Sequence, residues 1–160
     1  EKLGFKKVYF GGVTMEKLKE ANLEVNESNE KMIREGLRKE YGMGAYAVIL
    51  LPRIEEYLKS GNVILDGLYS WDELKILKEK FKDNLVVLSI VVNKEYRYER
   101  LSIREIRPLS NSDAEKRDIS EIENISKAGP IAFADYYILN NGNLDDYKKE
   151  LDDITKIIMG

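Results

Sequence analysis

The sequence predicts an α/β fold in three layers, α/β/α, in which a parallel sheet lies between two layers of helices. Short segments made almost wholly of apolar residues alternate along the chain with longer segments of helical periodicity. Continuous apolar strands are typical of parallel sheets covered on both faces, whereas half-exposed strands alternate apolar and polar residues. The 160 residues contain no repeat and no linker-like stretch, so a single domain over 1–160 is expected.

Four strands are predicted, and all four are expected to join one parallel sheet. They span residues 5–10, 63–65, 85–92 and 136–139. The second strand follows a Gly61-Asn62 turn, and the fourth ends in the turn Asn140-Asn141-Gly142. The helical segments between the strands supply the crossover connections that parallel strands require.

Helices fill the intervals between the strands. Thr14 can cap a first helix over residues 15–21, and Asn26 or Ser28 can cap a second helix that ends near Glu40.

After an interruption at Gly42 and Gly44, an apolar helix is expected to run through Leu58 with a kink at Pro52. Ser70 can cap the next helix. Further helices are predicted over residues 71–81, 113–126 and 144–158.

The composition excludes several kinds of chemistry. The chain contains no cysteine and no histidine. Disulfides, thiol nucleophiles, the Ser-His triad and the usual zinc ligands are therefore ruled out, and no protein metal-ligand cluster is expected. Any catalysis would depend on carboxylates, Lys, Arg, Tyr and backbone groups.

Charge and hydropathy limit the possible partners. The net charge of −3 argues against a general nucleic-acid binder, since binding to a phosphate backbone requires a basic surface. The longest apolar run, residues 45–52, is too short to span a membrane. With no visible targeting segment, a cytoplasmic location and no membrane partner are expected. The oligomeric state is left open.

Arginines are concentrated between Arg97 and Arg117, directly after the strand predicted over residues 85–92. Arg100 and Arg104 are spaced i and i+4, which on a helix places both guanidinium groups on one face. Guanidinium forks match phosphate oxygens, and α/β sheets bind ligands beyond the carboxyl ends of their strands. The spacing therefore indicates a clamp for a polyphosphate. A solvated basic helix face is the alternative.

This segment resembles the lid of the P-loop nucleotide and nucleoside kinases, in which a helix carrying Arg-Leu-x-x-Arg follows the fourth strand. Arg100 and Arg104 stand at the two arginine positions. The residues that follow, Leu109-Ser110-x-x-x-Ala114-x-x-Arg117, are similar to the lid continuation of dephospho-CoA kinases. The resemblance implies a lid over about 100–120. Within it, the segment from Arg104 to Arg117 joins two helical stretches, contains Pro108 and Asn111 and carries charges that repel one another, so we expect it to be mobile until an anion binds.

Other segments resemble the same kinases in the same order along the chain. Residues 134–144 are similar to their last strand and nucleotide-base loop, and Asp66-Gly67 ends a segment similar to their third strand. Gly11-Gly12-Val13-Thr14 stands where the acceptor-binding helix begins, although dephospho-CoA kinases carry an aspartate there. The resemblance thus implies an acceptor-binding region over about 11–60.

The resemblance also implies a role for individual residues. Arg100 would stack on the donor base, with Asn141 and Gly142 beside the adenine ring. Catalytic roles would fall to three residues, Arg104, Arg117 and Asp66. Acceptor binding would fall to five, Gly12, Thr14, Arg34, Arg38 and Gly67. Some of these residues could instead have a purely structural role, because Asp66 also suits a turn and Asn141-Gly142 is itself a good turn sequence.

One part of the family pattern is missing from the sequence. These kinases begin with a strand and a Gly-x-x-x-x-Gly-Lys-Ser/Thr loop that holds the β- and γ-phosphates. No such loop occurs in the 160 residues, and residues 1–5 resemble the end of the helix that follows it. We therefore expect a full-length parent that uses ATP and Mg²⁺ to phosphorylate a small nucleotide-like or nucleoside-like acceptor. The 160 residues alone are expected to be inactive. The alternative is a non-catalytic binding module with the same fold.

Overall fold

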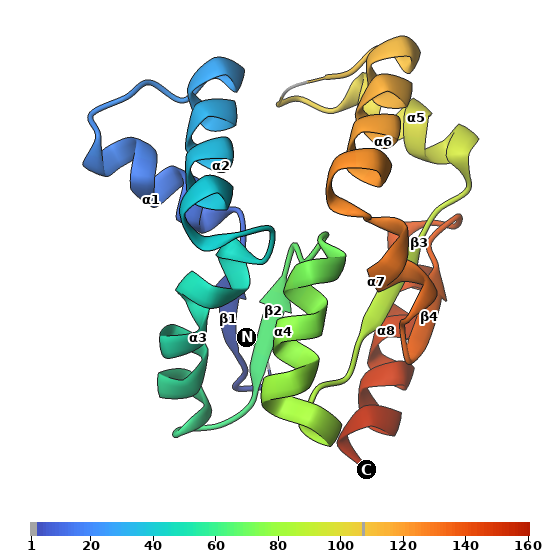
Figure 1. The fold of residues 1–160 in the computed structure, drawn as a ribbon. Coiled ribbons are helices and arrows are strands. Elements are labelled where there is room, and N and C mark those ends of the chain that lie inside the picture. The colour runs from blue at the N-terminus through green and yellow to red at the C-terminus, as the bar shows by residue number, and fades with distance from the viewer. Residues whose placement is uncertain (1–2, 107) are drawn as a thin grey trace. The chain divides into compact units, whose positions relative to one another are not determined.

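The computed structural model describes residues 3–106 and 108–160, which divide into two compact units, Glu1–Lys82 (unit 1) and Asp83–Gly160 (unit 2). Each unit contains one pair of parallel strands and four helices among its described residues (Figure 1). Glu1 and Lys2, assigned above to the end of a helix, and Arg107, within the predicted lid, lie outside the described residues. That residues 1–160 form a single domain stays a prediction.

Unit 1 is built around the strands β1 (Lys6–Tyr9) and β2 (Val63–Asp66). They pair in parallel with Val8 opposite Leu65, and the Phe10 amide donates to the Asp66 carbonyl at 2.9 Å just beyond the strands. Val8 is buried, whereas Tyr9 and Ile64 are exposed. The carboxyl ends of both strands therefore lie side by side.

Four helices complete unit 1. They are α1 (Gly12–Glu20), α2 (Glu27–Tyr41), α3 (Ala45–Leu58) and α4 (Trp71–Phe81). The apolar α3 contacts both strands and packs against α2 and α4, which explains why its sequence is the most hydrophobic. Asn26 caps α2 by accepting from the Asn29 amide at 2.9 Å, and Gly42 ends it at φ +81°.

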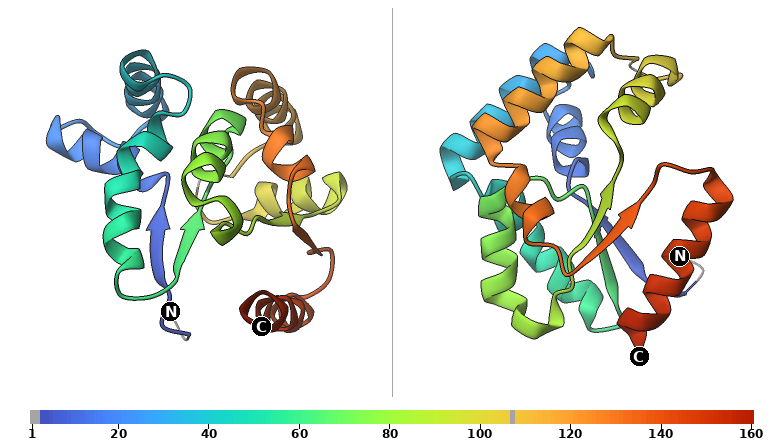
Figure 2. Two further views of the ribbon diagram at one scale, coloured as in Figure 1. Left: turned by 60° about the horizontal axis from the view of Figure 1, so that its bottom comes forward. Right: turned by 90° about the vertical axis from the view of Figure 1, so that its right-hand side faces the viewer.

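Unit 2 is built around β3 (Leu88–Val91) and β4 (Tyr136–Leu139), which pair in parallel with Ile90 opposite Ile138. Its helices are α5 (Lys94–Ile103), α6 (Asn111–Ile125), α7 (Ala128–Ala132) and α8 (Leu144–Met159). In the right-hand view of Figure 2, β3 leads into α5 and β4 leads into α8. Both helices therefore begin beyond the carboxyl ends of the strands.

Most of the predicted elements are confirmed, and the fold class is α/β. The strand predicted over 85–92 is shorter than expected, because Val87 instead donates its amide to the Asp135 carboxylate at 2.7 Å. The helix α7 was not predicted. Within the described ranges β1 pairs with β2 and β3 pairs with β4, both in parallel as predicted, and that all four strands join one sheet stays a prediction. No helix in these ranges has the length and apolar character needed to cross a membrane.

Candidate functional site

The first candidate site lies in unit 2, where Arg100 meets the loop that follows β4. Its Nη1 donates to the Asn140 carbonyl at 2.7 Å and its Nη2 to the Gly142 carbonyl at 3.0 Å. The structure thus brings together Arg100, Asn141 and Gly142, the three residues predicted to bind the nucleotide. Because Arg100 is exposed and both terminal nitrogens donate to the loop, the guanidinium is held as a flat group on the surface.

A second contact fixes the same loop to the end of β3. The Asn93 amide donates to Asn141 Oδ1 at 2.9 Å, and the Asn140 amide donates to the Val91 carbonyl at 2.8 Å. Asn141 therefore acts as more than a turn residue, because its side chain holds the residue that precedes α5. The start of α5 and the loop after β4 are consequently one connected structure.

A hollow of about 370 Å³ adjoins this loop. Asn140 and Gly142 line one side, and the first turns of α8 contribute Asp146, Tyr147 and Glu150. Its polar lining includes three carboxylates, Asp146, Glu150 and Asp153, and one lysine, Lys149, so its net charge is negative, which disfavours a phosphate group but suits a neutral ring or sugar.

The other arginines of the segment are held elsewhere on α5 and α6. Arg97 donates to both carboxylate oxygens of Asp118 at 2.6 Å, and the Tyr98 hydroxyl donates to Asp118 at 2.9 Å. The hydrogen bonds from Arg97 hold the pKa of Asp118 below its ordinary value. This contact joins α5 to α6.

The predicted helical spacing of Arg100 and Arg104 is wrong, because α5 ends at Ile103 and Arg104 has an extended backbone. The two guanidinium groups therefore do not lie on one helix face. Arg117 donates to Glu121 at 2.9 Å, four residues along α6. Burial raises the pKa of Glu121, but Lys127 and Arg117 together bring it below its ordinary value. The catalytic roles of Arg104 and Arg117 stay predictions.

The second candidate site is a buried polar cluster in unit 1. The Thr14 hydroxyl lies 2.6 Å from the Tyr46 hydroxyl, and both side chains are buried. Thr14 is therefore not the N-cap that the sequence predicts. The helix α1 begins at Gly12, one turn earlier than expected, and Thr14 points inward to link α1 to α3. Burial raises the pKa of Tyr46, with Arg38 and Arg34 acting in the opposite direction.

The two predicted acceptor arginines differ in their surroundings. Arg34 donates to Glu27 at 2.6 Å and to the buried Glu30 at 3.4 Å, so its charge is matched along α2. Arg38, one turn further on, has a buried Nε without a hydrogen-bond partner. Its charge acts on Tyr46 and on Glu73, a buried carboxyl on α4. Both arginines act on Tyr46, but Arg38 is the one that also acts on Glu73 and keeps a buried Nε without a partner.

Glu73 and Ser70 are the members of the cluster that sequence reasoning missed. Glu73 is 4% exposed and accepts a hydrogen bond from the Ser70 backbone amide. Burial raises the pKa of Glu73 to about 7, although the Ser70 amide and Arg38 act to lower it. The Ser70-x-x-Glu73 pattern is a capping-box signature, which could have indicated the pair in advance.

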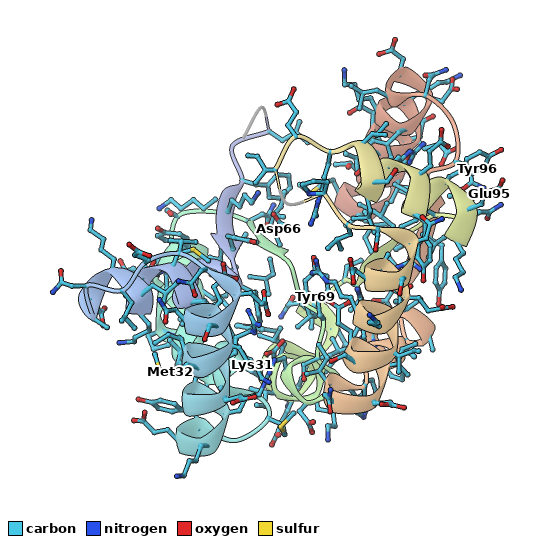
Figure 3. All side chains as sticks on the ribbon, turned by 90° about the horizontal axis from the view of Figure 1, so that it is seen from above. Lys31, Met32, Asp66, Tyr69, Glu95 and Tyr96 are labelled. Carbon is cyan, nitrogen blue, oxygen red and sulfur yellow. The ribbon has the colours of Figure 1, made fainter. Side chains whose placement is uncertain are left out.

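Asp66, Gly12 and Gly67 lie at the carboxyl ends of β1 and β2. Figure 3 looks onto these ends and labels Asp66 and Tyr69, which mark the segment between β2 and α4. Asp66 forms an ion pair with Lys7 at 2.6 Å, with both side chains about half exposed. A Cβ on Gly67 would lie 3.3 Å from the Tyr9 ring, and one on Gly12 would lie 3.7 Å from it. The two glycines therefore flank Tyr9.

Comparison with known proteins places the chain in a family. No family model matches it. A UPF0200 protein of Thermococcus kodakarensis is 31% identical over 155 residues, covering 94% of this chain and 83% of the relative. A UPF0200 protein of Thermococcus gammatolerans is 30% identical over 165 residues, covering the whole chain and 86% of the relative.

The chain belongs to the UPF0200 family. A UPF0200/UPF0201 protein of Archaeoglobus fulgidus is also 30% identical over 160 residues, which cover 93% of this chain and 47% of that protein. The names of these UPF0200 relatives state no activity, so the function must be argued from the residues. In the described part of the chain, no three or more Asp or Glu side chains are grouped to hold a metal ion.

Proposed function

We propose that the full-length protein transfers a phosphoryl group from ATP, with Mg²⁺, to a small nucleotide-like or nucleoside-like acceptor. The proposal includes a three-layer, P-loop NTPase-like fold. ATP would supply the transferable phosphoryl group and Mg²⁺ would neutralise part of its charge. The residues of this chain would position the donor base and the acceptor, since phosphoryl transfer depends mainly on positioning and electrostatic stabilisation.

One observation carries the proposal, namely the contact of Arg100 with the loop after β4. Two of the five N–H donors of Arg100 are taken by the carbonyls of Asn140 and Gly142, which anchors the guanidinium on the loop and leaves fewer donors for phosphate oxygens. The flat face of a guanidinium remains able to stack on an aromatic ring. Arg100 is therefore suited to hold a purine base rather than a phosphate, in agreement with the role implied by the family resemblance.

The hollow beside this loop supports the same assignment. Asp146 and Glu150 would repel a triphosphate, whereas carboxylates accept hydrogen bonds from sugar hydroxyls and amino groups. The donor base and sugar would therefore lie against unit 2. The phosphates would lie elsewhere, and their contacts are assigned to Arg104, Arg117 and a P-loop only by the family resemblance.

The experiment is a titration of the full-length protein and its Arg100→Ala variant with ATP, ADP and adenosine. Loss of base stacking should weaken all three by about tenfold, since such contacts are worth about 1–2 kcal/mol. Arg100→Lys should recover little, because an ammonium group is not flat. Arg53→Ala is the matched control, since Arg53 forms an exposed ion pair with Glu16 on unit 1 and should leave all affinities unchanged.

Turnover is measured as ADP release over a panel of nucleoside and nucleotide acceptors. Nucleotide affinity that does not depend on Arg100 would contradict the proposed base site. The second candidate is a non-catalytic nucleotide-binding module with the same fold, since base binding by Arg100 does not itself require phosphoryl transfer. Arg100-dependent binding without ADP release from any acceptor would identify that candidate.

A further inference from the structure

The buried cluster of unit 1 contains two hydrogen-bond donors that have no partner. Ser70 is 1% exposed and its Oγ makes no hydrogen bond. The Nε of Arg38 is likewise buried without a partner. Buried polar groups in folded proteins are nearly always hydrogen-bonded, so two orphan donors in one cluster require an explanation. A polar group of a bound ligand can provide the missing partner, as an ordered water molecule does in many proteins.

Ser70 occupies an N-cap position without capping; Asn93 before α5 does the same, but Asn93 is exposed, whereas Ser70 is buried. Its backbone is extended, as expected just before α4, but its hydroxyl does not accept from the first turn of the helix. Ser110, before α6, shows the usual arrangement, since its Oγ accepts from the Asp113 amide at 3.2 Å. A capping box has two hydrogen bonds, one to the side chain of the N-cap residue and one from its backbone amide. At the start of α4 only the second is present, because the Ser70 amide donates to Glu73. The Ser70 hydroxyl can therefore form a hydrogen bond with a group outside the helix.

The charges around the cluster indicate which kind of group would fit. Arg38 and Glu73 carry opposite charges and act on each other across α2 and α4. The charge of Arg34 is already matched by Glu27 and Glu30. A phosphate or carboxylate would have to compete with Glu73 for Arg38 and would meet its repulsion.

A neutral hydroxyl avoids this repulsion. It can donate to the Glu73 carboxyl and accept from Arg38 Nε or Ser70 Oγ, because a hydroxyl has one donor and two acceptor positions. It would thus satisfy an orphan donor without adding charge to a nearly neutral cluster.

We propose that Ser70, Arg38 and Glu73 form a subsite for a sugar-type hydroxyl group of the acceptor. This inference rests on the proposed function and narrows it, since it identifies the acceptor as a nucleoside-like compound bound through its sugar. Tyr46 and Thr14 complete the polar wall from α3 and α1. Ser70, Arg38 and Glu73 are positioning residues here, with no covalent role.

The test uses adenosine and 2′,3′-dideoxyadenosine, which differ only in the sugar hydroxyls. The wild-type protein should bind adenosine at least about tenfold more tightly than the dideoxy compound, since sites built for a hydroxyl reject analogues that lack it. Ser70→Ala and Glu73→Gln should each remove this preference. Equal affinities of the wild-type protein for the two nucleosides would overturn the proposal.

Two controls separate binding from folding. Ser70→Ala should not lower the urea unfolding midpoint, because the hydroxyl it removes caps nothing. Ser110→Ala should lower that midpoint but leave the adenosine preference intact. A drop in the midpoint of Ser70→Ala with the preference unchanged would mean that Ser70 is an ordinary cap, and would refute the subsite.

Two further measurements distinguish this proposal from neighbouring ones. Adenosine could also occupy the proposed donor site on unit 2, so the titrations are repeated with Arg100→Ala, in which the Ser70-dependent preference must persist. Its persistence would support the subsite even if phosphoryl transfer were never observed.

Inorganic phosphate is the other probe. Binding of phosphate that depends on Arg38 and is unaffected by Ser70→Ala would identify an anion site and overturn the hydroxyl assignment.

Discussion

Replacing Glu73 with glutamine should remove a pH-dependent loss of stability that the wild-type protein suffers between about pH 4.5 and about pH 7. Glu73 is 4% exposed, and its burial raises the pKa from an ordinary value of 4.5 to about 7. Each pKa unit corresponds to about 1.36 kcal/mol, so the full penalty for holding an ionised Glu73 in the folded state is about 3 kcal/mol.

The sign follows from proton binding. A carboxyl whose folded-state pKa is raised binds its proton more tightly in the folded state, so the folded state carries no penalty below the unfolded pKa. As the pH rises, the unfolded chain loses this proton first and stability falls, until the folded pKa is passed and the loss is complete. Asp72 raises the pKa of Glu73 further, whereas Arg38 and the Ser70 amide act to lower it.

The assay is urea unfolding of wild type and Glu73→Gln at several pH values from about 4.5 to about 8. Glutamine keeps an acceptor for the Ser70 amide but cannot ionise, so the stability of the variant relative to wild type should rise by about 3 kcal/mol across this range. Glu79→Gln makes the same chemical change at an exposed position of α4 and should show no such rise. Parallel pH profiles for wild type and Glu73→Gln would refute the reasoning.

Three further predictions concern the contacts that hold each unit together. Tyr46→Phe should destabilise unit 1 by about 1–3 kcal/mol because it leaves the Thr14 hydroxyl buried and unpartnered, and adding Thr14→Val should recover part of this in a double-mutant cycle. Asp118→Asn should cost about 1 kcal/mol, measured by urea unfolding at neutral pH, since the pair with Arg97 is partly exposed. Because Arg97 lowers the pKa of Asp118, that contribution should vanish in acid. Leu77→Ala should cost about 2–5 kcal/mol in thermal unfolding, as Leu77 is fully buried.

The elements of the fold could be read from the sequence because their signals are local. Asn26 and the glycine at position 42 act through their own backbone neighbours, and they set the bounds of α2 as predicted. The start of β3 was misplaced because it depends on Asp135, which lies far away in sequence and takes the Val87 amide out of the ladder. Pairing of strands is likewise a non-local property that apolar content alone does not specify.

The candidate sites were predicted unequally for the same reason. Arg100 and the loop at 140–142 were found together because an ordered set of motifs indicated both. Arg104 was misplaced because the spacing argument assumed a helix that in fact ends at Ile103. Ser70 and Glu73 carried a visible capping-box pattern, but whether a cap hydroxyl is used depends on tertiary geometry, which no sequence pattern records.

The orphan donors in unit 1 also distinguish a functional cluster from a structural one. A buried hydroxyl without a partner costs about 1–3 kcal/mol, and alanine at position 70 would avoid that cost without losing a cap. Elsewhere the protein satisfies comparable groups, as Thr14 does with Tyr46 and as Ser110 does with Asp113. Among the described residues, Ser70 Oγ and Arg38 Nε are the buried side-chain atoms without a hydrogen-bond partner, and both belong to this cluster, which marks it as a place where stability has been given up for binding. Thr14, Arg38 and Tyr46 of that cluster lie in the region of about 11–60 that the family resemblance implies for the acceptor, and Ser70 and Glu73 follow soon after Gly67, another predicted acceptor residue, which is why we assign the acceptor's recognition to the cluster.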